Sequence, residues 1–181
     1  MRPGERVLVT PAGGGVGSLL IQLLHARGAW VAGAARGDRK LKSTRALGAR
    51  AAFDYGHEDW TERALASADG RGFDVVLDGV GGDIGRVSLA LTAPGGRFIG
   101  YGGPSGEFVR PEPGHAARMR SLFDLELAAG DERRLIEAAL RQAAAGRLRP
   151  VIGQTYPLEQ AADAHTAIEA RAALGKTLLL P

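Results

Sequence analysis

The sequence contains no cysteine, and its 181 residues include only two methionines and two tryptophans. Without cysteine, the chain can form neither a disulfide bond nor a zinc site built on thiolates. The sequence also lacks any apolar run near the roughly 20 residues that a membrane-spanning helix needs, and it has no signal-peptide pattern. We therefore expect a protein of the cytoplasm that does not bind membranes.

Clustered positive charge is missing as well. The net charge is +3 and the pI is about 9.7, but the arginines are scattered, with no basic stripe that carries interleaved aromatic residues. This distribution argues against nucleic-acid binding. The four histidines have no partners at metal-ligand spacings such as i and i+4. We therefore expect neither a nucleic acid nor a metal ion as a partner.

Apolar residues, at 45% of the chain, and glycines, at 27 residues, are abundant. Short apolar runs alternate with amphipathic segments, which predicts strands and helices in turn. The expected strands are 6–10, 30–35, 51–54, 73–78, 97–101 and 176–180, and the expected helices are 16–27, 39–47, 58–68, 84–91, 132–145 and 158–169. This order predicts a Rossmann-type α/β fold, a doubly wound parallel sheet in a three-layer α/β/α arrangement, as a single domain over residues 1–181.

The stretch from Val7 to Arg36 is the most informative part of the chain. An apolar run, a glycine turn and an amphipathic helix follow one another, and a second apolar run comes next. This is the order of the dinucleotide-binding fingerprint. Glycines let the backbone approach a pyrophosphate, and the helix start offers free N–H groups to it. We therefore predict that Gly14, Gly15 and Gly17 contact the pyrophosphate and that Val16 packs beneath the cofactor; the alternative is a tight turn without a ligand.

The choice between the two nicotinamide cofactors depends on the residues after the second strand. An NAD-preferring fold carries an acidic residue there for the ribose hydroxyls, but this sequence has Ala34, Ala35 and Arg36. Arg36 and Lys40 would instead hold a 2′-phosphate. We therefore predict NADP(H) rather than NAD(H). The alternative, a solvated helix start rich in cations, is electrostatically unfavourable by about 0.3–1 kcal/mol.

Two further glycine-rich turns follow strands and should lie at the same carboxyl edge of the sheet. Gly79 and Val80 come after the expected strand 73–78, and Tyr101 and Gly102 come at the end of the expected strand 97–101. We predict that these residues lie near the nicotinamide. Residues 104–130 are irregular in pattern, and their second half is compatible with either a helix or a strand.

Motifs along the whole chain resemble those of one family. They are Ala12–Gly17 with Gln22, Lys40 with Leu47-Gly48-Ala49, Phe53-Asp54-Tyr55, Asp74–Gly82, Pro94–Arg97, Gly146–Pro150, Pro157-Leu158, Ala164-His165 and Gly175–Leu179. The sequence resembles the nucleotide-binding half of the zinc-independent medium-chain dehydrogenase/reductases, in their quinone oxidoreductase-like branch. The resemblance implies NADPH-dependent hydride transfer to a small quinone or enone. It also places Lys40 near the 2′-phosphate and Tyr55 beside the adenosine.

The resemblance leaves out the N-terminal GroES-like barrel of the family, which supplies most of the substrate pocket. We therefore assign no catalytic residue. One hypothesis is the cofactor half of an oxidoreductase, as a fragment or a subunit completed by a separate barrel chain. The alternative is a non-catalytic nucleotide-binding or interaction module. An exposed apolar face where the barrel would pack favours the first. Residues 105–127 depart in pattern from the edge strand with which the family forms dimers, which argues against dimerisation by sheet continuation. A homodimer and a separate barrel subunit are the two alternatives for the assembly.

Overall fold

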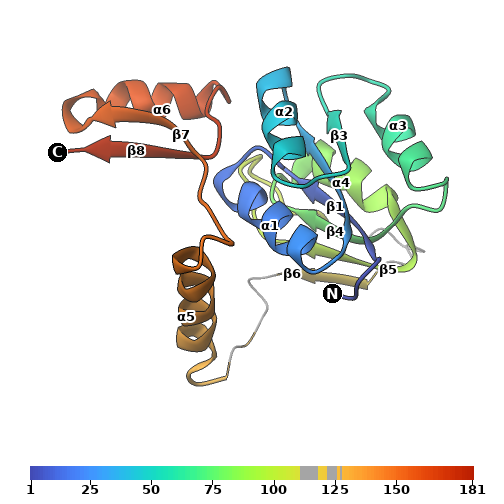
Figure 1. The fold of residues 1–181 in the computed structure, drawn as a ribbon. Coiled ribbons are helices and arrows are strands. Elements are labelled where there is room, and N and C mark those ends of the chain that lie inside the picture. The colour runs from blue at the N-terminus through green and yellow to red at the C-terminus, as the bar shows by residue number, and fades with distance from the viewer. Residues whose placement is uncertain (111–117, 122–125, 127) are drawn as a thin grey trace.

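The computed structural model describes residues 1–110, 118–121, 126 and 128–181. Its centre is a six-stranded sheet in the order β3-β2-β1-β4-β5-β6, and all paired neighbours run parallel (Figure 1). The strands are β1 (Arg6–Thr10), β2 (Trp30–Ala35), β3 (Ala51–Asp54), β4 (Phe73–Asp78), β5 (Thr92–Gly100) and β6 (Arg118–Ser121). Because the strand order reverses between β1 and β4, their carboxyl ends form the crevice where parallel sheets bind ligands.

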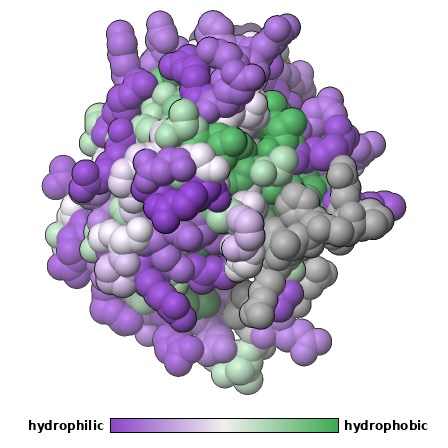
Figure 2. Space-filling view, turned by 90° about the vertical axis from the view of Figure 1, so that its right-hand side faces the viewer, coloured by the Kyte–Doolittle hydropathy of each residue, from purple (hydrophilic) through white to green (hydrophobic). Residues whose placement is uncertain are grey.

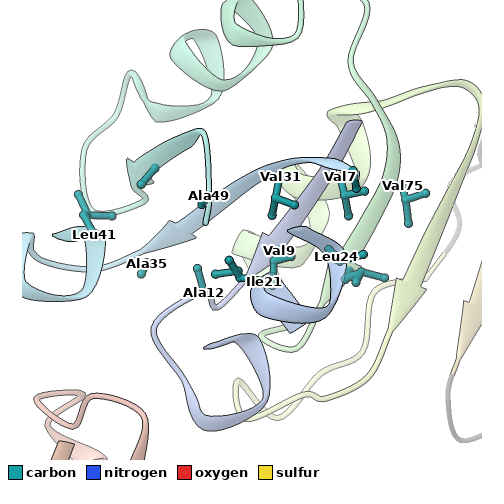
Figure 3. Packing of buried hydrophobic residues seen from close by; sticks show 13 residues of the cluster. Val7, Val9, Ala12, Ile21, Leu24, Val31, Ala35, Leu41, Ala49 and Val75 are labelled. Atoms are coloured by element: carbon teal, nitrogen blue, oxygen red, sulfur yellow. The ribbon is translucent and has the colours of Figure 1, made fainter. Parts of the chain in front are cut away.

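Four helices cover the two faces of this sheet: α1 (Gly15–Ala26), α2 (Asp38–Ala46), α3 (Trp60–Ser67) and α4 (Gly82–Ala90). Side chains alternate between the faces along each strand, as the pleat requires. Val7 and Val9 of β1 pack with Ile21 of α1 in one cluster (Figure 3). Leu8, between them, packs with Trp60 of α3 and Leu89 of α4 in the other. These two clusters and the parallel sheet confirm the predicted Rossmann-type α/β fold.

The last third of the chain lies beside this body rather than within it (Figure 1). It contains α5 (Asp131–Ala144), β7 (Ile152–Pro157), a 3₁₀ turn (Leu158–Gln160), α6 (Ala161–Glu169) and β8 (Lys176–Leu180). β7 and β8 pair in parallel with each other and form a separate two-stranded sheet. That the whole chain is one domain stays a prediction.

Hydrogen bonds to backbone groups attach this C-terminal part to the Rossmann body. The Gln22 side chain of α1 donates to the Arg149 carbonyl and accepts from the Arg149 N–H, both at 2.9 Å. The Gly175 N–H donates to the Gly13 carbonyl at 2.8 Å. The segment before β8 therefore lies against the turn that joins β1 to α1.

Most predicted elements lie where the sequence placed them, but two segments differ. β5 begins at Thr92 rather than at residue 97, because the expected turn at residues 93–96 is a bulge: the pairing with β4 jumps from Thr92 to Arg97. The segment expected to be either helix or strand holds the edge strand β6. The rest of that expectation, residues 111–117, 122–125 and 127, lies outside the described residues.

The turn from β1 to α1 predicts different outcomes for two alanine substitutions. A Cβ on Gly17 would lie 2.0 Å from the Pro11 carbonyl oxygen, whereas a Cβ on Gly14 would meet nothing closer than 3.6 Å. Gly17→Ala should therefore lower the free energy of unfolding by about 1–3 kcal/mol or more, while Gly14→Ala should leave it within about 0.5 kcal/mol. Urea denaturation checks this, and equal stabilities of the two variants would contradict it.

Candidate functional site

The glycine turn forms a bare stretch of backbone at the start of α1. Helix α1 begins at Gly15, its N-cap Gly14 makes no side-chain capping bond, and its first turn contains no acidic residue. The first N–H groups of a helix have no partners within that helix, and the helix dipole makes this end positive. Ser18, in the first turn, donates its hydroxyl to the Gly15 carbonyl at 3.1 Å. By this general property the start of α1 offers N–H donors to an anion, and its contact with a cofactor stays a prediction.

A cavity of about 690 Å³ lies beside this turn. One wall comes from the glycine turn, the end of β2 at Ala35, and Lys40 of α2. Further lining residues come from the end of α6 at Ile168, from the connection at Arg171 and from the first residue of β8, Lys176. The cavity is therefore closed by two parts of the chain that are far apart in the sequence.

Four of the predicted site residues line this cavity: Gly14, Gly15, Lys40 and Tyr55. The others occupy neighbouring positions that the cavity lining does not include. Val16 is 49% exposed at the start of α1, Gly17 is buried, and Arg36 is exposed directly after β2. Gly79, Val80, Tyr101 and Gly102 lie at the carboxyl ends of β4 and β5. Contact of any of these residues with a cofactor stays a prediction.

Positive charge gathers at the α2 side of the cavity. Burial lowers the pKa of the Lys40 ammonium group, and the charges of Arg171, Arg36 and Arg39 lower it further. The Lys40 ammonium donates to the Arg171 carbonyl. None of these four cations forms an ion pair with a carboxylate among the residues that the structure describes. Such a group of cations, held close without counterions, is an electrostatic site for an anion.

The carboxylate nearest to this group comes from β3 and not from β2. Asp54 accepts the Gly37 N–H at 2.8 Å and the Gly56 N–H at 2.7 Å, so it fixes the turn that leads into α2. Burial raises the pKa of Asp54, but these two N–H groups, His57 and Arg36 outweigh that effect and hold the pKa below its usual value. The pKa of the next residue, Tyr55, is raised, and burial of its side chain is the largest cause.

Two basic residues of the cavity were missed by the sequence analysis. Arg171 and Lys176 both come from the C-terminal segment. Arg171 has a left-handed backbone with φ +56°, directly before a glycine-containing connection to β8. The only signal in the sequence was the Gly175-Lys176 pair, which had been assigned to the start of a strand and not to a site.

A second polar group lies under the ends of β4 and β5. Asp78 accepts from the Thr10 hydroxyl at 2.9 Å and from the N–H groups of Val80 at 3.1 Å and Gly81 at 3.0 Å. Burial raises the pKa of Asp78. The Tyr101 hydroxyl donates to the Thr10 carbonyl at 3.0 Å, and its ring covers Gly79, where a Cβ would lie 2.3 Å from a ring carbon. These contacts fix the loop after β4, which agrees with the expectation that Asp78 caps a loop.

Metal ligands do not converge in the part of the chain that the structure describes, where no group of three His, Asp or Glu side chains could hold an ion. No helix of the described residues is long and apolar enough to cross a membrane.

Comparisons with known proteins agree with this geometry. Residues 47–179 match the model of a family described as "Zinc-binding dehydrogenase". The whole chain is 33% identical to the quinone oxidoreductase of Pseudomonas aeruginosa and spans 58% of that protein. Among solved structures, it superposes on the Escherichia coli quinone oxidoreductase complexed with NADPH with a TM-score of 0.89 and 28% identity, again over 58% of that chain. A structure titled as an NAD-dependent alcohol dehydrogenase matches with a TM-score of 0.83 and 34% identity, over 99% of this chain and 52% of the other.

The polar group around Asp78 gives a stability prediction. Asp78→Ala should lower the free energy of unfolding by about 1–3 kcal/mol, because it leaves two buried N–H groups without an acceptor and the Thr10 hydroxyl with only the Leu77 carbonyl at 3.5 Å. Asp83→Ala is the matched control, since Asp83 is exposed and pairs only with Arg86 three residues away. Denaturation in urea at neutral pH measures both, and a loss no greater for Asp78→Ala than for the control would contradict this role of Asp78.

Proposed function

The chain belongs to the zinc-binding dehydrogenase family, and from that premise we propose that it is the NADP(H)-binding domain of a quinone or enone oxidoreductase. The chain spans about 58% of the length of the relatives it matches, and a substrate domain would supply the remainder of the active site. The observation that carries the proposal is the cavity between the glycine turn and the unpaired cations Lys40 and Arg171.

The residues of this cavity fit the parts of NADP(H). The uncapped start of α1 at Gly14 and Gly15 suits the diphosphate. Lys40, Arg171 and Arg36 would hold the 2′-phosphate, and the half-buried ring of Tyr55 would lie beside the adenosine. The end of β2 and the residue after it read Ala34-Ala35-Arg36, with no carboxylate at the position where one would meet the ribose hydroxyls and repel that phosphate. Glu169 is the only carboxylate among the described residues that line the cavity.

The bound cofactor would supply the hydride for reduction of a small-molecule quinone or enone. The chain's own residues would bind and orient the dinucleotide, with its nicotinamide toward the ends of β4 and β5. There Asp78 and Tyr101 hold the loops that carry Gly79, Val80 and Gly102. We assign no proton donor to this chain, and independence of zinc stays a prediction of the sequence.

The apolar surface of the C-terminal part supports completion by a second domain. Leu135, Ile136 and Leu140 of α5 are more than half exposed, and α5 has no buried residue. In β8, Leu178, Leu179 and Leu180 are exposed to 39–50%. By contrast, the face of the Rossmann body seen in Figure 2 is mostly hydrophilic, with one limited hydrophobic area. Such a concentration of exposed leucine and isoleucine marks an interaction surface.

This surface supports packing of a further domain on α5 and β8. The alternative, a non-catalytic module, calls for a polar or self-associated face at the cleft wall toward the nicotinamide. The partner is proposed to be a substrate domain of the barrel type, on the same or a separate chain. Because β6 ends the order of the six-stranded sheet, a homodimer formed along β6 stays a prediction.

Cofactor preference tests the proposal directly. NADPH should bind to the 181-residue chain about tenfold more tightly than NADH, because only NADPH carries the phosphate that Lys40 and Arg171 would contact. Lys40→Ala should remove most of this difference and leave the NADH affinity unchanged. Lys42→Ala, on the same helix but outside the cavity lining, is the control. Titration calorimetry measures all four cases; equal affinities for the two cofactors in the unmodified chain would overturn the assignment.

The lowered pKa of Lys40 predicts how this preference depends on pH. In the free protein burial, and after it the neighbouring cations, favour loss of the Lys40 proton, so the pKa lies below its ordinary value of 10.5. A bound phosphate favours the charged form, and binding therefore takes up a proton once the pH exceeds the lowered pKa. NADPH affinity should fall as the pH rises through that window toward about pH 10, whereas NADH affinity should stay level over the same range. Calorimetry at several alkaline pH values checks this, and a parallel fall for both cofactors would exclude Lys40 as the cause.

A further inference from the structure

Helix α5 stands apart from the Rossmann body in Figure 1, and none of its described residues is buried. Residues three and four positions apart lie on the same side of a helix. This spacing collects the apolar side chains of α5 in one exposed stripe, which consists of Leu135, Ile136, Ala139, Leu140 and Ala143. Its three large members are exposed to 52–62%. An apolar stripe stabilises a helix only when something covers it, so α5 is suited to packing against a partner.

Four charged side chains of α5 pair with each other within the helix. Arg134 pairs with Asp131 at 2.7 Å, and Arg141 pairs with Glu137 at 3.6 Å. Both pairs are exposed and each is neutral as a whole. They therefore give no preference for a partner of one charge sign.

The two ends of the stripe carry opposite charges. Glu132 lies in line with it, three and four residues before Leu135 and Ile136. At the other end, directly after α5, the Arg147 Nε–H donates to the Gln142 side chain at 2.7 Å, which holds the guanidinium beside the last turn. Neither Glu132 nor Arg147 forms an ion pair in the part of the chain that the structure describes. The stripe thus ends in a free carboxylate on one side and a free guanidinium on the other.

This charge pattern is complementary to itself when it is turned by 180°. Glu132 and Arg147 lie on either side of Ala139 at similar separations of about 10–12 Å along the helix axis. A two-fold axis at Ala139 would therefore bring Glu132 of each copy beside Arg147 of the other. The helix dipoles would also oppose each other, and the small Ala139 side chain would let the two helices approach closely. In a parallel pair, by contrast, like charges would meet at both ends.

We propose that α5 pairs with α5 of a second copy of this chain in an antiparallel, two-fold arrangement. The apolar stripes are in contact, and a Glu132–Arg147 ion pair closes each end. This proposal assigns the α5 part of the exposed apolar surface to a second copy. The leucines of β8, which lie apart from α5 in Figure 1, stay free for a substrate domain.

The dimer is expected to be weak. One pair of helices of 14 residues covers less surface than the roughly 1,200–2,000 Å² of a stable interface. We therefore expect a dissociation constant of about 10–500 µM. The proposal does not depend on cofactor binding, since α5 contributes no residue to the described lining of the cavity.

Sedimentation equilibrium of the 181-residue chain, up to concentrations of about 1 mM, measures this association. Leu140→Asp should make the chain monomeric throughout, because it places a carboxylate in the centre of the apolar contact. Leu158→Asp is the matched control: Leu158 is 54% exposed but lies in the 3₁₀ turn, outside α5. This variant should associate like the unmodified chain.

Charge reversal tests the antiparallel arrangement. Glu132→Arg and Arg147→Glu should each weaken the dimer about tenfold, because each replaces two attractive pairs by two repulsive ones. The double variant exchanges the two charges and should restore the dissociation constant to within about threefold of the original. In a parallel pair the double variant would keep like charges together and restore nothing.

Thermal unfolding of each variant checks that the fold is intact. A chain that stays monomeric over the whole concentration range would overturn the proposal and leave the α5 stripe to the substrate domain. A dimer that Leu140→Asp affects no more than Leu158→Asp uses another surface, such as the edge of β6, and the proposal is then wrong. A double charge variant as weak as the single ones would refute the antiparallel arrangement. None of these outcomes alters the NADPH and NADH titrations, which test the proposed function separately.

Discussion

The contact between Gly17 and the carbonyl of Pro11 determines where the functional part of this molecule can lie. A Cβ at residue 17 would be 2.0 Å from that oxygen, so only glycine allows α1 to start directly against the end of β1. This closeness directs the first turn of α1 toward the crevice between β1 and β4. The rest of the site is arranged around that turn: the cations of α2 on one side, and the segment that leads into β8 on the other. A shift of α1 would separate all of these groups.

A lysine side chain lies on each side of the glycine turn. Lysine side chains extend along Gly13 and Gly15, and neither lysine has a carboxylate partner in the described residues. The Asp54 carboxylate, which lies at the turn leading into α2, accepts the N–H groups of Gly37 and Gly56. The protein thus keeps negative charge engaged in turns and leaves positive charge free around the cavity. That distribution suits a ligand with several phosphate groups better than one with a single charge.

The sequence predicted the first half of the fold in detail, because glycines mark the ends of the apolar runs there. β1 to β4 begin and end at the expected residues, and the glycine turn and Lys40 lie at the cavity as expected. Arg171 and Lys176 could not be predicted, because their place depends on pairing across the chain: the Lys40 ammonium and the Arg171 carbonyl are 131 positions apart. The sequence predicts a turn at Pro94-Gly95-Gly96. In the structure β4 pairs with Thr92 before these residues and with Arg97 after them, so they form a bulge within β5. For β6, four residues with two arginines are too short for a periodicity to separate strand from helix.

The bridge between Gly14 and Gly175 joins the loop after β1 to the segment that leads into β8, and both line the same cavity. A ligand that contacts both sides gains part of its binding free energy from each. By thermodynamic linkage, that gain is also the additional work needed to detach the C-terminal strands from the Rossmann body. Occupancy of the cavity would therefore set how firmly the leucine-bearing surface of β8 is presented to its surroundings.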